Sequence, residues 1–432
     1  MVRVSVQNCQ WGVGQGGFHT LHLAAVSEKT DQEMHFNAVY DCGGEIPALE
    51  TSISHYIDWL VLNRHKTVDC IYLSHLDEDH YGGVRYLLAK LRKVSIAVRN
   101  IFIPHLTPLE RLVIAVESQL RQSENGDTSG SPVDPLDLTD PVRNLRESFP
   151  EVNIVELIPA VNPGAEDFEE VPPRWRVVGE ISEATLQVDR HRGMFRLSTV
   201  KISREIWQLI PTVDSRADDM THKVRSAVES DSGIGINDVA NLTTQDIEAL
   251  LSDESRTEKL ARALKKHAIG AGTDPGMDTS FSNCSSIILY WGPTTETADT
   301  IAQTGFQVFP FGDDFKACGE IAAGTGKAFA WLGTGDADLG SAKPVDNLFA
   351  NIEEVANNIG VVSAPHHGAR RNSTQRFWDK LRNLRVVTFE YGASNRYGHP
   401  SPEVVAHGLL RGSRCVHVKR NLFVFNQEFR LT

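Results

Sequence analysis

The densest group of chemically competent side chains lies in residues 74–80, directly after the β-rich run 68–73. The group combines two imidazoles with two carboxylates, those of His75, Asp77, Asp79 and His80. Together these groups are typical ligands of a divalent transition metal, such as Zn²⁺ or Mn²⁺. Alternate side chains of an extended segment share a face, and a turn through Gly82-Gly83 can bring the last histidine round. The alternative interpretation is a polar loop of an acidic protein.

Three other strand-like runs end in residues of the same kind. They are Asp336 after residues 328–332, His366 and His367 after 360–364, and Asp41 after 34–40. Each is a weak signal alone, because an aspartate before a glycine is a common turn residue. Active sites of open α/β sheets collect at strand ends, so four such ends in one chain predict a shared metal site.

The elements that must position these residues alternate between strands and helices. We expect strands at 18–26, 34–40, 68–73, 100–103, 151–159, 285–291, 328–332, 360–364, 386–391, 415–418 and 422–425. We expect helices at 46–63, 82–91, 246–251, 255–267, 345–358, 374–384 and 402–410. This alternation is typical of a layered α/β architecture. Residues 106–279 are mostly polar and predict a large insertion between two halves of one core, 1–105 and 280–432.

Composition limits the classes of function. The net charge of −13 argues against a protein that coats nucleic acid with its whole surface, so any such contact must be local. The six cysteines are scattered, which favours a reducing compartment and predicts a cytoplasmic protein. No run approaches the ~18 apolar residues of a membrane span, so we expect no membrane association.

Several motifs together resemble the metallo-β-lactamase superfamily. The pattern His75-x-Asp77-x-Asp79-His80 resembles its metal motif, with aspartate at the second position, where histidine is commoner. This variant is similar to the soluble metallo-β-lactamase-like domain of ComEC-type competence proteins. Further resemblances follow in that family's order, at Val13-Gly14-Gln15-Gly16-Gly17, Asp41-Cys42-Gly43-Gly44, 283–289, Thr334-Gly335-Asp336-Ala337-Asp338, Pro365-His366-His367-Gly368 and 395–400.

The resemblance implies an αβ/βα four-layer sandwich that holds one or two divalent ions, Zn or Mn, at one edge. His75 and Asp77 would hold one ion, and Asp336 would bridge to the second. The second ion would be held by Asp79, His80 and one of the pair His366 and His367, of which we favour His366. Asp41 would orient ligands. A further histidine expected at the first ion has only weak candidates, which are His105, His191, His222 and His267, with Asn283 near the expected place.

The implied activity is that of a metal-dependent hydrolase, most simply a phosphodiesterase or nuclease that uses a metal-bound hydroxide. Asp79 would also orient the nucleophile. His399 and Asn395 would contact a phosphate or protonate the leaving oxygen, although His399 is equally explained as a structural residue. A local basic groove would be formed by Arg85, Lys90, Arg92, Lys93 and Arg99 and by residues 259–266. Arg370 and Arg371 would bind substrate phosphates. The alternative interpretation of all these charges is a solvated surface.

Two other functions remain open at this point. The same fold supports the hydrolysis of other esters or thioesters, and the metal ligands do not distinguish these substrates. The insertion could instead dock a protein partner. The chain would then be an effector or regulatory subunit of a multi-protein bacterial system, such as an antiphage defence module.

Overall fold

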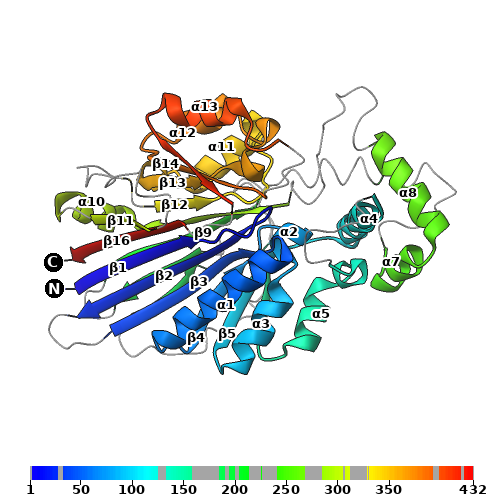
Figure 1. Ribbon diagram of the computed structural model, residues 1–432, viewed down its shortest axis with the longest axis horizontal. Helices are drawn as coiled ribbons and strands as arrows, with labels where there is room; N and C mark the ends of the chain where they lie inside the picture. The colour runs from blue at the N-terminus through cyan, green and yellow to red at the C-terminus, as the bar shows by residue number, and fades with distance from the viewer. Residues whose placement is uncertain are drawn as a thin grey trace, which may run out of the picture.

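Two eight-stranded sheets form the centre of the molecule (Figure 1). The computed structural model describes residues 2–27, 33–124, 133–157, 184–189, 194–199, 204–213, 225, 241–267, 285–304, 307–311, 328, 330–392, 398–419 and 423–431. Within these residues the sheets pack face to face, and helices cover the outer face of each sheet. The predicted layered α/β architecture is confirmed, and it is consistent with the metallo-β-lactamase fold.

The first sheet is mixed. Its order is β11 (Gln307–Phe311), β16 (Phe423–Leu431), β1 (Val2–Gln10), β2 (Phe18–Ser27), β3 (Glu33–Cys42), β4 (Thr67–Tyr72), β5 (Ala97–Pro104) and β6 (Asn153–Leu157). Strands β3 to β6 run parallel to one another, whereas β1 pairs antiparallel with both β2 and β16.

The second sheet has the same mixed character. Its order is β15 (Arg414–Val418), β14 (Val386–Glu390), β13 (Ile359–Ser363), β12 (Ala330–Gly333), β10 (Ile287–Pro293), β9 (Arg204–Val213), β8 (Met194–Thr199) and β7 (Ala184–Asp189). Strands β12 to β15 are parallel, and β10 joins them antiparallel.

Helices lie on the outer faces because their apolar residues recur at helical spacing. In α1 (Ile46–Leu62), for example, Leu49, Ile53, Tyr56 and Leu60 are buried. Figure 1 shows α1 and α3 (Val84–Lys93) over the first sheet, and α11 (Ala342–Asn351), α12 (Gln375–Lys380) and α13 (Pro402–Leu410) over the second. The other helices are α2 (Glu78–Tyr81), α4 (Pro108–Glu124), α5 (Pro141–Ser148), α7 (Thr244–Leu251), α8 (Glu254–His267) and α10 (Thr295–Thr304), with short 3₁₀ turns at Pro135–Leu138, Ala356–Asn358, Pro365–Gly368 and Arg370–Asn372.

Successive side chains of each strand point to opposite faces of its sheet and therefore pack into different layers. On β2, Leu21 and Leu23 point into the core between the sheets, whereas His22 points to the side of α1. The same intersheet core holds three buried tryptophans, Trp207, Trp291 and Trp331. Because β3 and β4 are parallel, and β12 and β13 are parallel, the loops that follow them leave the sheets in one direction. Their carboxyl ends therefore meet at one end of the sandwich, near α2 (Figure 1).

The region 106–279 is more closely integrated than the sequence indicates. Strand β6 pairs with β5, and β9 pairs with β10, so both sheets continue into this region. Trp207 and Leu209 of β9 are fully buried in the intersheet core. These strands belong to the core rather than to an insertion, while the division into two halves and an insertion otherwise stays a prediction. Among the described residues, helices are too short or too polar to cross a bilayer.

Candidate metal centre

The carboxylate of Asp336, directly after β12, lies between four imidazoles. Its Oδ1 atom is 3.2 Å from Nε2 of His80 and 3.3 Å from Nε2 of His367. Its Oδ2 atom is 3.7 Å from Nε2 of His366 and 3.9 Å from Nε2 of His75. The two oxygens of one buried aspartate thus face two separate pairs of histidines.

Two further aspartates complete this arrangement. Asp77 Oδ2 is 3.7 Å from Nε2 of His75. Asp79 Oδ2 is 3.4 Å from Nε2 of His367 and 4.0 Å from Nε2 of His80. We call the group of His75, Asp77 and His366 the first half-site, and the group of Asp79, His80 and His367 the second half-site. Asp336 lies between them.

The geometry reverses our preference within the histidine pair. His367, and not the favoured His366, lies beside Asp79, and His366 faces the half of the site that contains His75. Both residues adopt left-handed backbone conformations, with φ of 48° and 55°, so the chain turns sharply and sends the two rings to different sides. His366 is also fixed by its backbone N–H, which donates to the carbonyl of Gly335 at 2.9 Å.

Asp41 and Ser74 determine which ring nitrogens face the centre. His80 Nδ1 is 2.8 Å from Asp41 Oδ2, so its N–H donates outward to that carboxylate. The Ser74 hydroxyl donates to the same Oδ2 atom at 2.9 Å, so Ser74 Oγ accepts from His75 Nδ1, also at 2.9 Å. Both histidines therefore direct Nε2, and not Nδ1, to the centre, where it would bind a cation. Ser74 was not among the site residues predicted from the sequence, although a hydroxyl directly before the first histidine was a visible signal.

The inward-facing atoms fit a cation. Among the described residues, Nε2 of His75, His80 and His367 and Oδ1 of Asp336 are buried without a hydrogen-bond partner. Buried polar atoms normally have such partners, and four of them around the same acidic centre indicate ligands of a cation. Three imidazoles and a carboxylate suit Zn²⁺ or Mn²⁺. The atoms of His75, Asp79, His80 and Asp336 lie close enough together to hold one ion.

The pKa values of the site residues reflect the carboxylates that are gathered at the centre. Burial alone lowers the pKa of His80, but the carboxylates of Asp336 and Asp41 outweigh burial and raise it well above its usual value. The pKa of His367 is raised in the same way, with burial opposed by Asp336 and Asp79. The pKa of Asp336 lies well below its usual value, because the nearby imidazoles outweigh its burial. Protons on the histidines thus balance the carboxylates, a task that a divalent cation can perform.

Glycines allow the loops around the centre to approach one another. A side chain at Gly43 would place its Cβ atom 2.2 Å from the backbone carbon of Asp79, which no real contact permits. Gly335, directly before Asp336, has a φ of +49°, and its Cβ would lie 2.5 Å from Ser74 Cβ. The turns of Asp41-Cys42-Gly43-Gly44 and Thr334-Gly335-Asp336 therefore need glycine to bring their aspartates into the centre.

His399 lies at the rim of this centre, with its ring 5.6 Å from that of His366. Burial lowers its pKa to about 4, and the neighbouring His366 and His367 act in the same direction. Asn395, Asn283, His191 and His222 lie outside the described residues, as does the side chain of His267. His105 is not at the centre, because its Nδ1 atom pairs with Glu156 at 3.3 Å.

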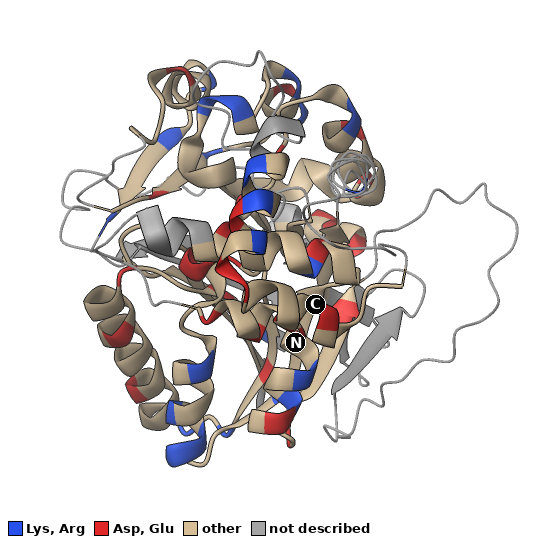
Figure 2. Cartoon of the chain, turned by 90° about the vertical axis from the view of Figure 1, so that its right-hand side faces the viewer, with Lys and Arg blue, Asp and Glu red and all other residues tan. Residues whose placement is uncertain are grey.

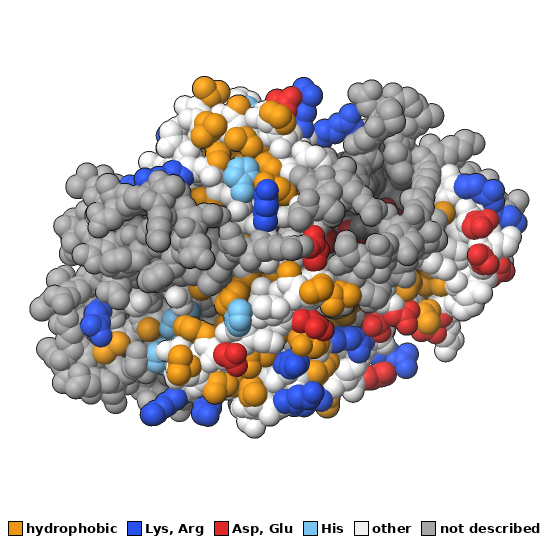
Figure 3. All heavy atoms as spheres, in the orientation of Figure 1, with side chains coloured by type: hydrophobic (Ala, Val, Ile, Leu, Met, Phe, Trp, Pro, Cys, Tyr) orange, Lys and Arg blue, Asp and Glu red, His pale blue; other side chains and the backbone are white. Residues whose placement is uncertain are grey.

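The predicted basic groove is largely neutralised by acidic partners. Arg85 pairs with Asp137 at 2.9 Å, Arg92 with Glu151 at 2.6 Å, and Arg99 with Asp69 at 3.1 Å. Lys90 lies over the ring of Tyr86. Basic and acidic side chains are interspersed over the described elements in Figures 2 and 3. Arg370, just after the histidine pair, is exposed and reaches Glu403 at 3.4 Å.

Comparison with known proteins finds one family whose model matches the first part of the site. Residues 35–170 match the model of the metallo-beta-lactamase superfamily. The match contains Asp41 and all four metal-type residues of 75–80, and it ends before Asp336 and the histidine pair. A search of curated proteins returned no match. Residues 35–170 therefore resemble the metallo-β-lactamase superfamily, and the finer likeness to ComEC-type proteins stays a prediction.

Proposed function

We propose that this protein is a metal-dependent hydrolase of phosphodiester bonds, and that its substrate is a nucleic acid. The observation that carries the hydrolase is the Asp336 carboxylate, which offers one oxygen to each half-site. A carboxylate in that position is suited to bridge two divalent cations. Held there, such cations would activate water and neutralise the charge of a phosphoryl group.

Each residue around the centre would have a role that follows from its exposure and its contacts. Asp79 is the most open carboxylate of the centre, with 26% of its side chain exposed against 7% for Asp336. A substrate would therefore approach past Asp79, which would orient the attacking water by accepting its proton in a hydrogen bond. Asp41 would keep His80 and, through Ser74, His75 in their orientations.

His399 would bind the substrate rather than act as the proton donor. Its pKa of about 4 leaves the ring neutral at pH 7, and a neutral imidazole donates one hydrogen bond to a phosphoryl oxygen. Asn395, close to it in the sequence, would share this task. The exposed Arg370 would add positive charge next to the histidine pair.

Support for a phosphodiester comes from the order of the motifs and from these donors at the rim. Hydrolysis of another ester or a thioester is the second candidate, because the half-sites alone do not select the acyl or phosphoryl group. A role as effector or regulatory subunit of a multi-protein system is compatible with either chemistry. Partner binding through residues 106–279 would then be required before activity appears.

The decisive experiment is hydrolysis of labelled single-stranded and duplex DNA with Mn²⁺ or Zn²⁺. Wild type is compared with Asp336→Ala and with Glu78→Gln, which alters a carboxylate of the same 75–80 segment that is not among those around Asp336. Cleavage that needs metal, survives in Glu78→Gln and is lost in Asp336→Ala establishes the nuclease. Metal-loaded protein that cleaves neither DNA but hydrolyses a small ester or thioester would replace the phosphodiester with the second candidate.

A further inference from the structure

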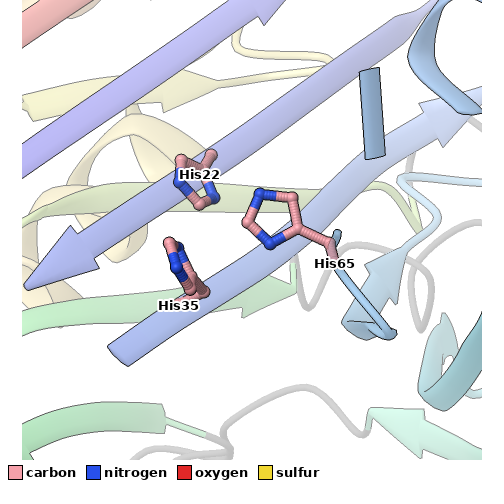
Figure 4. A group of neighbouring side chains, drawn as sticks. All are labelled: His22, His35 and His65. Carbon is pink, nitrogen blue, oxygen red and sulfur yellow. The ribbon is translucent and has the colours of Figure 1, made fainter. Parts of the chain in front are cut away.

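A second group of histidines lies beside strands β2 and β3 of the first sheet, away from the metal centre. His22 of β2, His35 of β3 and His65 of the turn after α1 each direct a ring nitrogen toward a common point (Figure 4). These ligand atoms lie within 4.8 Å of one another. On β3, His35 precedes Asp41 by six residues, which corresponds to roughly 20 Å of extended strand. The proposed hydrolytic site makes no use of this group.

The backbone brings these three residues together by separate routes. His22 and His35 are diagonal neighbours on paired strands, because His22 pairs with Asn37 and His35 with Ala24. His65 is returned to the sheet by the end of α1, where its N–H donates to Leu60 and that of Arg64 to Val61. This termination places Arg64 in a left-handed conformation, with φ of 59°, which is unfavourable for a residue other than glycine.

The hydrogen bonds of Asn37 orient His22 for metal binding. Asn37 Nδ2 donates to the carbonyl of Thr67 at 3.0 Å, so its amide oxygen is the atom that faces His22. His22 Nδ1 lies 2.9 Å from that oxygen and must carry the proton. Its Nε2 atom is therefore a lone-pair donor. The backbone N–H of Asn37 donates to the buried carboxylate of Asp69 at 2.9 Å, which fixes this support.

We propose that His22, His35 and His65 form a second metal site, which takes a borderline divalent transition ion such as Zn²⁺. Three imidazoles without a carboxylate favour such an ion over Mg²⁺ or Ca²⁺. Tetrahedral Zn²⁺ with Zn–N bonds of ~2.0–2.1 Å holds its ligand nitrogens roughly 3.3 Å apart. Small rotations of the rings about χ2 close the remaining gap. His22 and His35 are only half-buried, so water completes the fourth position.

An ion bound at this site would link three separate segments of the fold. The site joins the β2–β3 hairpin to the turn between α1 and β4, close to the hydrogen bond from Asn37 Nδ2 to the carbonyl of Thr67. Trp59 of α1 packs against His22 and His65, with ring centroids 5.1 Å and 5.0 Å apart. Ion binding at three fixed imidazoles would raise the stability of the fold without any part in catalysis.

The test counts zinc in full-length protein that has been stripped with a chelator and reloaded. We expect His35→Gln and His65→Gln each to bind one equivalent of Zn²⁺ fewer than wild type. The matched control is His55→Gln, which removes an exposed imidazole from α1 and should bind as much as wild type. Equal zinc content in all four proteins would overturn the proposal and leave the histidines as packing partners of Trp59.

A second measurement separates this site from the metal centre. In the Asp336→Ala background, zinc should still raise the melting temperature, and the further change His65→Gln should abolish that rise. Co²⁺ bound in the same background should give the visible absorption of a tetrahedral site. If His65→Gln does not fold, His35→Gln at a half-buried strand position provides the same comparison. No zinc effect in the Asp336→Ala background would also overturn the proposal.

Discussion

The molecule contains two groups of histidines, and the charge around them differs. At the metal centre the imidazoles alternate with carboxylates, and the pKa values of His80 and His367 are raised. In the group of His22, His35 and His65, burial and the two neighbouring histidines together lower the pKa of His22 to about 3. His80 and His367 thus stay protonated at the centre, whereas His22 is neutral. A cation would replace protons at the centre, whereas in the second group it would bind to a ring that is already neutral.

The largest expected effect separates the two groups by function. Asp336→Ala should lower the rate of hydrolysis by roughly 1,000-fold or more, because it removes the group shared by both half-sites. The same variant should keep the zinc bound by the other three histidines. Conversely, His35→Gln should retain the hydrolytic rate. Rates and metal content of both variants check this, and a loss of activity in His35→Gln would show that the two regions are coupled.

A smaller effect tests whether Asp41 orients the metal-binding histidines. Asp41→Asn should weaken metal binding at the centre about 10- to 100-fold, because His80 and Ser74 lose the carboxylate that fixes their protons. Competition with a chromogenic chelator measures the affinity. Asp58→Asn, an exposed change on α1, is the control. Unchanged affinity in Asp41→Asn would mean that packing alone orients the two histidines.

The close approach of the loops gives a third test. Gly43→Ala should destabilise the fold by about 1–3 kcal/mol, since its methyl group would overlap the backbone at Asp79. Gly82→Ala is the matched control, because Gly82 has a φ of −57° that any residue adopts. Denaturant unfolding of the metal-free proteins compares them. Equal stability of Gly43→Ala and wild type would contradict the tight contact between the two loops.

The smallest expected effect concerns pH. His80 and His367 have raised pKa values in the metal-free fold, so their contribution to stability is complete below about pH 6.5 and is lost as pH rises through the raised values. The metal-induced rise in melting temperature should therefore grow by a few degrees from about pH 6 to 9. Thermal scans with and without Zn²⁺ measure it. Asp336→Ala should show a flatter dependence, and a rise that is independent of pH would contradict this electrostatic account.

The sequence predicted the elements that carry the centre but not all of their partners. The strands before Asp41, His75, Asp336 and His366 are rich in apolar residues, and each was expected within a few residues of its observed position. Strands β1 and β7 to β9 were not expected, because the second-sheet members follow a polar region whose composition resembles a loop. The helix expected at 345–358 ends at Asn351 in the structure.

Within the site, spacing alone did not separate His366 from His367. Their assignment to the two half-sites depends on two consecutive residues with left-handed backbone, which no periodic pattern predicts. The group of His22, His35 and His65 was also missed, because its members come from two strands and a turn and form no local motif. Such a group becomes visible only once the register of β2 and β3 is known.

The pairing of β1 with β16 has a consequence for how the protein is made. Strand β1 is the first described strand and β16 the last, so one edge of β1 stays without its neighbour until β16 has been synthesised. At about 5–20 residues per second, the roughly 400 residues between them take on the order of 20–80 s to synthesise. During that time the edge of β1 is open to pairing with other chains. A chaperone that covers this edge during synthesis should therefore raise the yield of folded protein.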